Sequence, residues 1–269
     1  MKLIYFGDVV GKSGRTVLLD VLPGLLDRLS PDFVMVNGEN AAHGFGITGS
    51  ICEKFFDAGV DVITTGNHAW DQKEIIEYIK TEPRLLRPLN YPETTPGLGS
   101  GVFEARDGSK VLVAQVMGRL FMDPLDDPFA AIDKAVKGAV LGDDIDCIVV
   151  DIHAEATSEK MSMGHYLDGR ASMVVGTHSH VPTADAQILP GGTAYQTDLG
   201  MCGDYNSVIG MKKEAAIGRF LKTMPSERLE PAEEAGTACG IYLETDNATG
   251  LAVRVEPLRI GSRLKEANL

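Results

Sequence analysis

Side chains of the types that bind metal ions recur along the first two thirds of the sequence. They are two carboxylates, two amides and three imidazoles, namely Asp8, Glu39, Asn40, Asn67, His153, His178 and His180. A site for two metal ions uses carboxylate, imidazole and amide oxygen ligands, and one carboxylate commonly bridges the two metals. Taken together, these residues have the composition that a dinuclear metal centre requires.

Taken singly, these groups also have ordinary structural explanations. Asp8 could cap the turn after a strand, and His153 could be a buried histidine whose hydrogen bonds are satisfied. His178 and His180 are the most informative pair, because side chains two residues apart in an extended segment lie on one face. Two imidazoles on one face can bind two adjacent metals, although an exposed loop could also place them together.

The candidate ligands follow segments that have the pattern of buried strands. Short apolar, β-prone runs cover residues 2–7, 33–37, 60–64, 147–152 and 173–176. In an open α/β sheet, ligands bind at the carboxyl ends of the strands. The loops after these runs would therefore direct their side chains into one shared volume.

The remaining pattern favours a mixed α/β protein. Helices are predicted near 14–29, 48–58, 71–80 and 128–140, with a break or kink of the first at Pro23 and Gly24. Repeated strand–loop–helix units indicate a parallel sheet, and residues 81–101 read as irregular. Antiparallel pairs are predicted for 102–106 with 110–117 and for 240–244 with 251–258. We expect one domain over residues 1–269, with at most a small insertion near 40–50 or 155–170.

The composition limits the class of protein and of partner. The 269 residues are 44% hydrophobic, which is enough for a sizeable core. A net charge of −13 without a basic stripe argues against a long nucleic-acid partner. Small phosphoesters stay open as substrates, because bound cations can reverse the local field. Without a membrane-length apolar run or a signal-peptide pattern, a soluble cytoplasmic protein with no membrane partner is expected.

The cysteines suggest no further site. Cys52, Cys147, Cys202 and Cys239 contain no C-x-x-C pair, so neither a zinc finger nor a thioredoxin motif is present. We expect these residues to be reduced thiols that fill apolar space.

The polar motifs resemble those of the calcineurin-type metallophosphoesterase superfamily. They occur in its order: Gly7-Asp8, Gly38-Glu39-Asn40, Gly66-Asn67-His68, His153 and Gly176-Thr-His178-Ser-His180. More narrowly, the runs GDVVG, NGENAAHG, TTGNHAWD, PLDDPF, DIHAEATSEK and DGRASMVVGTHSHV resemble the bacterial YmdB-like phosphodiesterases. The usual D-x-H opening is Asp8-Val-Val10 here and the usual second Asp is Glu39, departures that the YmdB-like group shares.

This resemblance implies a fold and a role for each residue of the motifs. The fold would be the four-layer α/β/β/α sandwich of the metallophosphoesterase type. The first metal would bind Asp8, Glu39, Asn40 and His180, and the second Glu39, Asn67, His153 and His178, with Glu39 bridging. His68 would not bind metal but would protonate the leaving alkoxide. The resemblance favours iron for both positions, and the ligand types leave manganese and zinc open.

The resemblance also implies 2′,3′-cyclic nucleotides as substrates ahead of 3′,5′-cyclic AMP, and it points to a homo-oligomer. Residues that could line the substrate pocket are His43, Glu155, Thr157, Ser158, Asp168 and Arg170. Arg170 could bind a phosphate through two hydrogen bonds or form a structural ion pair. For Asp71, a helix N-cap is favoured over a role in orienting the His68 ring.

Two other functions remain open at this point. The same ligands would serve a metal-dependent phosphomonoesterase, such as a nucleotidase or phosphoprotein phosphatase. A regulatory protein that senses a nucleotide without turnover is a further alternative, although a pure binding protein needs no proton donor next to its ligands. A Rossmann-type dinucleotide site is excluded, because Gly7-Asp-Val-Val-Gly11 does not have the G-x-G-x-x-G spacing.

Overall fold

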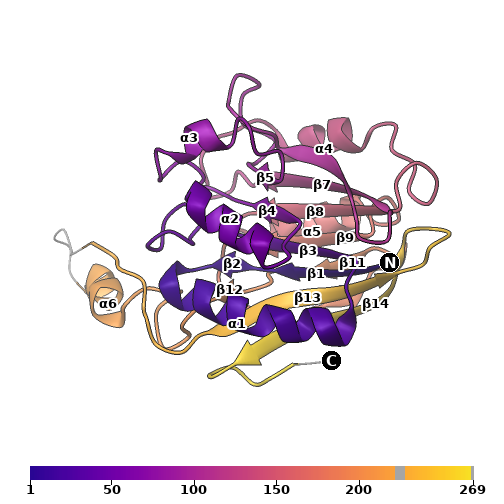
Figure 1. Ribbon diagram of the computed structural model, residues 1–269. Coiled ribbons are helices and arrows are strands. Elements are labelled where there is room, and N and C mark those ends of the chain that lie inside the picture. Colours follow the sequence, from indigo (N-terminus) through magenta and orange to yellow (C-terminus); the bar gives the residue numbers. More distant parts are fainter. Residues whose placement is uncertain (222–227, 268–269) are drawn as a thin grey trace.

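Two mixed β-sheets form the centre of this computed structural model, which describes residues 1–221 and 228–267 (Figure 1). From edge to edge, the first sheet consists of β14 (Ala252–Gly261), β13 (Thr237–Thr245), β1 (Lys2–Phe6), β3 (Phe33–Asn37), β4 (Val62–Thr64) and β5 (Leu85–Leu86). The strands β1, β3, β4 and β5 run parallel, whereas β13 and β14 are antiparallel to their neighbours.

The second sheet has a parallel centre as well. Its order is β10 (Gln187–Ile188), β11 (Ala194–Gln196), β9 (Met173–Thr177), β8 (Cys147–His153), β7 (Lys110–Met117) and β6 (Ser100–Glu104). Only the pairs at its two edges, β10–β11 and β6–β7, are antiparallel. A small parallel pair, β2 (Asp8–Val9) with β12 (Met201–Cys202), extends the end of β1.

Helices cover the outer faces of both sheets. Apolar side chains of α1 (Gly11–Leu29), α2 (Gly49–Asp57) and α3 (Ile75–Tyr78) share one core cluster with the first sheet. Those of α4 (Pro128–Val136) and α5 (Thr157–Tyr166) share another with the second sheet. In Figure 1, α1 and α2 lie in front of the first sheet, and α6 (Lys213–Leu221) stands apart at the left.

A third apolar cluster joins the two sheets face to face. Consecutive residues of β1 alternate between clusters, so that Leu3 and Tyr5 pack between the sheets while Ile4 and Phe6 pack toward the helices. This alternation follows from the two-residue period of a strand. Because both faces of the sheet are covered, the strand reads in the sequence as one continuous apolar run.

Most of the predicted elements are confirmed, including the mixed α/β fold and both antiparallel pairs. Of the break or kink predicted at Pro23, the break is wrong, because α1 begins at Gly11 and continues through Pro23 to Leu29. Pro23 and Gly24 lie on the exposed face of the helix, where water can bond the carbonyl that proline leaves without a donor. The helix predicted near 71–80 is also too long, since only Ile75–Tyr78 is helical.

The structure also bears on what the sequence predicted for the cysteines and for membrane-spanning segments. All four cysteines are free and buried. Within the described ranges, no helix is both long and apolar enough to cross a membrane.

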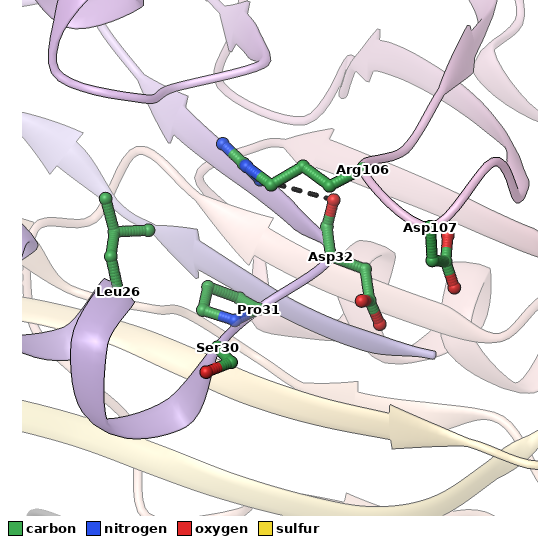
Figure 2. A pocket seen from close by; sticks show the side chains of 6 residues that line it. All are labelled: Leu26, Ser30, Pro31, Asp32, Arg106 and Asp107. Carbon is green, nitrogen blue, oxygen red and sulfur yellow. Dashed lines mark hydrogen bonds between the residues drawn. The ribbon is translucent and has the colours of Figure 1, made fainter.

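The parallel strands also define two opposite sides of the molecule, one at their carboxyl ends and one at their amino-terminal ends. Their carboxyl ends share one edge, called the site edge below, and it carries the loops that follow β1, β3, β4, β8 and β9. The amino-terminal ends of β3 and β7 lie at the other edge. A shallow pocket there contains Arg106, whose guanidinium donates to the carbonyl oxygen of Asp32 (Figure 2).

Candidate metal centre

His153 is the centre of the polar cluster at the site edge. It ends β8 and is completely buried. Its Nε2 lies 3.1 Å from Oε2 of Glu39 and 2.9 Å from Oδ1 of Asn67, and its Nδ1 lies 2.8 Å from Oγ1 of Thr177. The structure therefore brings together candidate ligands that come from the loops after β3 and β4 and from the end of β8.

The contact with Thr177 determines how this imidazole is oriented. The Thr177 hydroxyl donates to Oδ1 of Asp151 at 2.8 Å, so its oxygen accepts from Nδ1–H of His153. In the neutral ring, the lone pair of Nε2 then points toward Glu39 and Asn67. Burial alone would lower the pKa of His153, but the carboxylates of Glu39 and Asp8 raise it to about 9. In the absence of a metal ion, the raised pKa favours the form of His153 that carries a proton on Nε2, between these ligands.

Glu39 is the acidic partner of that proton. Burial alone would raise its pKa, but His153 and the other nearby histidines outweigh burial and lower it to about 2. Glu39 is therefore ionised across the physiological range. Its Oε2 also accepts from the backbone N–H of His68 at 3.3 Å.

A second group of ligand types lies around Asp8 and His180. His180 donates from Nδ1 to the carbonyl oxygen of Ile209 at 2.7 Å, and burial lowers its pKa, which keeps the ring neutral. Asn40 donates from Nδ2 to the carbonyl oxygen of Gly44, which directs Oδ1 toward His180. Oδ1 of Asn40 and Nε2 of His180 are 3.1 Å apart, so two buried acceptors face each other. Such a pair is suited to a cation and is unfavourable without one.

Asp8 contributes another acceptor without a donor. The side chain is fully buried, and Oδ2 accepts from the backbone N–H of His178 at 3.1 Å. Among the described residues, Oδ1 of Asp8 has no hydrogen-bond partner. Burial raises the pKa of Asp8 well above its usual range, because a carboxylate at this depth lacks solvation. A bound cation would supply the positive charge that compensates this buried carboxylate.

The ligand atoms form two groups that share Glu39. Within each group, one atom from every residue lies within 4.8 Å of the others, and the groups are Glu39–His153–His178 and Asp8–Glu39–His180. Asn67 adjoins the first group through His153, and Asn40 adjoins the second through His180. The oxygen and imidazole donors fit two adjacent hard or borderline metal ions with a common carboxylate.

The space and the backbone conformation next to these ligand atoms are tightly constrained. A Cβ atom at Gly66 would lie 2.2 Å from Oε2 of Glu39 and 2.3 Å from Nε2 of His153, so no larger residue fits there. His178 and His180 both adopt left-handed backbone conformations, with φ of 96° and 64°. These conformations are uncommon outside glycine and must be held by their surroundings.

His68 lies beside the cluster, and its ring is held by Asp71. Nδ1 of His68 is 2.9 Å from Oδ2 of Asp71, and the ring packs edge-on against Phe45 with centroids 5.1 Å apart. The helix N-cap predicted for Asp71 is wrong, because α3 begins at Ile75 and is preceded by Glu74. The alternative use, orientation of the His68 ring, is the arrangement observed.

The predicted pocket residues divide into two groups. Oε2 of Glu155 is 3.1 Å from Nε2 of His178, and Thr157 and Ser158 follow at the exposed first turn of α5. His43 is exposed in the loop after Glu39.

By contrast, Asp168 and Arg170 precede β9 and lie at the edge away from the histidines. The guanidinium of Arg170 pairs with Asp133 at 2.7 Å, which is the structural ion pair that the sequence left open beside a phosphate contact. Asp168 accepts from the backbone N–H groups of Gly191 and Thr193.

Asp151 is a further residue of the site that the sequence prediction did not include. Its Oδ1 accepts from Thr177, and its Oδ2 accepts from Tyr5, Thr64 and Gln115. The side chain is fully buried between the two sheets, and burial raises its pKa. A lone carboxylate inside the apolar strand β8 was the only signal of this role in the sequence.

Comparisons with known proteins agree with this geometry. The profile of the YmdB-like protein family matches residues 4–258. A 2′,3′-cyclic-nucleotide 2′-phosphodiesterase from Bacillus subtilis is 46% identical over 97% of each chain. A hypothetical protein from Thermus thermophilus has 43% identity and a TM-score of 0.90 over 98% of this chain and 100% of its own. A phosphatase from Mycoplasma pneumoniae has 36% identity and a TM-score of 0.89, covering 97% and 93% of the two chains.

We predict that Thr177→Val destabilises the metal-free protein by about 1–3 kcal/mol, because Oδ1 of Asp151 and Nδ1 of His153 both lose their buried partner. The measurement is the free energy of unfolding in urea, in the presence of a chelator. Thr16→Val on the exposed side of α1 is the control and should change stability by less than about 0.5 kcal/mol. A Thr177→Val variant as stable as this control would contradict the orientation assigned to His153.

Proposed function

This chain belongs to the YmdB-like protein family, whose members include phosphodiesterases and phosphatases, and from that membership we propose a metal-dependent hydrolysis of small phosphodiesters. The preferred substrates in this proposal are 2′,3′-cyclic nucleotides, with 3′,5′-cyclic AMP hydrolysed more weakly. The proposed fold is the metallophosphoesterase sandwich of four layers in one domain, which the core clusters on both sides of each sheet support.

The observation that carries the proposal is the excess of buried acceptor atoms at the site edge. Oδ1 of Asp8 has no donor among the described residues, and Nε2 of His180 faces Oδ1 of Asn40. We assign Asp8, Glu39, Asn40 and His180 to one metal ion and Glu39, Asn67, His153 and His178 to the other. Glu39, which belongs to both atom groups, would bridge the two ions. Iron is the proposed metal, and manganese or zinc would accept the same donors.

When bound, the two ions would neutralise the phosphate oxygens and lower the pKa of a water molecule, so that hydroxide is available near neutral pH. The chain itself supplies the orientation and the exclusion of bulk water. Glu39, Asn40, His153 and His180 are buried, which strengthens every electrostatic interaction inside the cluster.

We assign the proton of the leaving group to His68. Its Nδ1 bonds to Asp71, so Nε2 is the ring nitrogen that can hold the proton for the leaving alkoxide. The backbone N–H of His68 bonds to Glu39, which anchors the main chain of His68 beside the proposed bridging carboxylate. A metal-ligand role is assigned instead to Asn67, one residue earlier.

The proposed substrate class rests on the similarity to the relative named as a 2′,3′-cyclic-nucleotide 2′-phosphodiesterase. In this chain, Glu155 reaches His178 at the rim of the cluster. A carboxylate repels the phosphate but accepts from a hydroxyl group, so we propose that Glu155 contacts the ribose. Exposed His43, Thr157 and Ser158 are the other proposed contacts at this rim.

Phosphomonoester hydrolysis is a second candidate function, because the similar Mycoplasma pneumoniae structure is described as a phosphatase. The same metal ligands would serve both reactions. Turnover of 2′,3′-cyclic AMP compared with that of adenosine 2′-monophosphate on one preparation distinguishes them. Binding of 2′,3′-cyclic AMP without turnover would favour the nucleotide-sensing alternative.

We expect Asp8→Ala to lose most of one metal equivalent and to abolish hydrolysis of 2′,3′-cyclic AMP, because it removes a buried ligand oxygen. Metal content by mass spectrometry and turnover are measured on protein purified without chelator, with about two metals per chain expected in the wild type. Asp20→Ala, on the exposed side of α1, is the matched control and should change neither quantity. A wild-type protein without metal would overturn the proposed function.

His68→Ala should retain both metals and lower turnover by roughly 10²–10⁴-fold, the range for loss of a general acid. Asp71→Asn keeps a hydrogen-bonding group beside Nδ1 of His68 and should lose less activity than His68→Ala. Metal content and kcat are measured for both variants. Loss of metal from His68→Ala would show that the proton-donor assignment is wrong.

The metal affinity should increase with pH between about 6 and 9. In the metal-free chain, the pKa of His153 is raised to about 9, and the metal must displace this proton to reach Nε2. Displacement of the His153 proton contributes about a tenfold tighter Kd per pH unit below 9 and nothing above it. Competition against a fluorescent chelator of known pH response measures the slope. His43→Ala should leave it unchanged, and a flat wild-type profile would contradict the linkage.

A further inference from the structure

The turn that carries His178 and His180 has a conformation that its own residues do not favour. Both histidines have positive φ, at 96° and 64°, and Ser179 lies between them. The direct contacts of the two side chains are with the polar cluster, Glu155 and Ile209. The backbone N–H of His178 donates to Oδ2 of Asp8, and the carbonyl oxygen of His180 accepts from the Tyr205 hydroxyl. Ser179, between these two anchored residues, is held by other groups.

A buried ion pair lies behind the turn and bonds to its central residue. Lys160 on α5 and Asp198 after β11 are 0% and 1% exposed, and Nζ of Lys160 is 2.7 Å from Oδ2 of Asp198. Nζ also donates to Oγ of Ser179 at 3.0 Å, and Oδ2 accepts from the backbone N–H of Ser179 at 3.0 Å. Oδ1 of Asp198 accepts from the backbone N–H of Gly200 at 2.8 Å. The pair thus forms hydrogen bonds with both the side chain and the backbone of Ser179.

A gain in the free energy of folding does not explain why this ion pair is buried. A buried pair of opposite charges loses its solvation, and apolar residues of similar volume are commonly as stabilising or more so. The Lys160 stem also constrains the neighbouring strand, because a Cβ atom at Gly176 would lie 2.7 Å from its Cδ. Charge-assisted hydrogen bonds are about twice as strong as neutral ones, and here they converge on one residue between two candidate ligands.

We propose that Lys160 and Asp198 are a positioning pair, which fixes the turn so that His178 faces Glu39 and His153 while His180 faces Asn40 and Asp8. The inference rests on the metal ligands assigned under the proposed function. Neither residue touches the substrate or the metals in this proposal. Outer partners of this kind orient metal ligands, and their loss commonly lowers metal affinity by about 10–100-fold.

The test compares Lys160→Met, Asp198→Asn and the double variant with the wild type. Each single variant leaves one buried charge without its partner, so both should unfold at lower temperature. The double variant removes both charges and should recover most of the thermal stability. Its metal affinity should nevertheless stay about 10–100-fold below that of the wild type, because Ser179 has lost its charge-assisted bonds.

The control is Arg106→Met, which breaks an ion pair of similar length with Asp61 at the edge away from the site. This variant should bind metal as the wild type does. If the double variant recovers metal affinity together with stability, the pair is a structural feature only and the proposal fails.

Hydrogen exchange of the peptide covering residues 176–182 gives a second readout that needs no metal. In the chelator-treated double variant, this peptide should exchange faster than in the chelator-treated wild type, because the Ser179 amide loses its carboxylate acceptor. Unchanged exchange overturns the positioning role. If the wild type binds no metal while the double variant exchanges faster, the proposed function fails and the positioning of the turn stands.

Discussion

Buried lone pairs converge at the site edge, and among the described residues not all of them have a donor. Oδ1 of Asp8 has no donor among the described residues, and Nε2 of His180 faces the amide oxygen of Asn40. His153, whose pKa is raised, faces Glu39 at 3.1 Å, whereas His180, whose pKa burial lowers, faces Asn40. Because a buried acceptor without a donor is costly, the loops that carry these groups must be held by contacts outside the cluster.

The contact between the two sheets supplies much of that support. Asp151 accepts from Tyr5 and Thr64 in the first sheet and from Gln115 and Thr177 in the second. A slip of one sheet along the other would separate Oδ2 of Asp151 from Tyr5 and Thr64, its two donors in the first sheet, so this polar group favours a single alignment of the sheets. Through Thr177, the same carboxylate reaches His153. Asp151 therefore links the alignment of the two sheets to the orientation of the His153 imidazole.

Local patterns predicted elements well where they coincided with the packing. Strands buried on both faces gave continuous apolar runs, and the glycine-rich loops after them marked the site edge. The errors arose where a local preference was weaker than its context. Pro23 did not end α1, because it lies on the exposed face of a helix whose other face is packed. Asp71, a good N-cap by type, bonds instead to the imidazole of His68.

The sequence by itself determined the types of ligand, their order along the chain and their place after apolar strands. It also contained the features by which the chain resembles its family. Only the tertiary structure decided which partners the remaining polar residues find. Lys160 and Asp198 are 38 residues apart, and Arg170 turned toward Asp133 instead of the site. The reason is physical: a strand or helix pattern is read from neighbours in sequence, whereas hydrogen bonds and ion pairs are selected by distances that exist only once the sheets have packed.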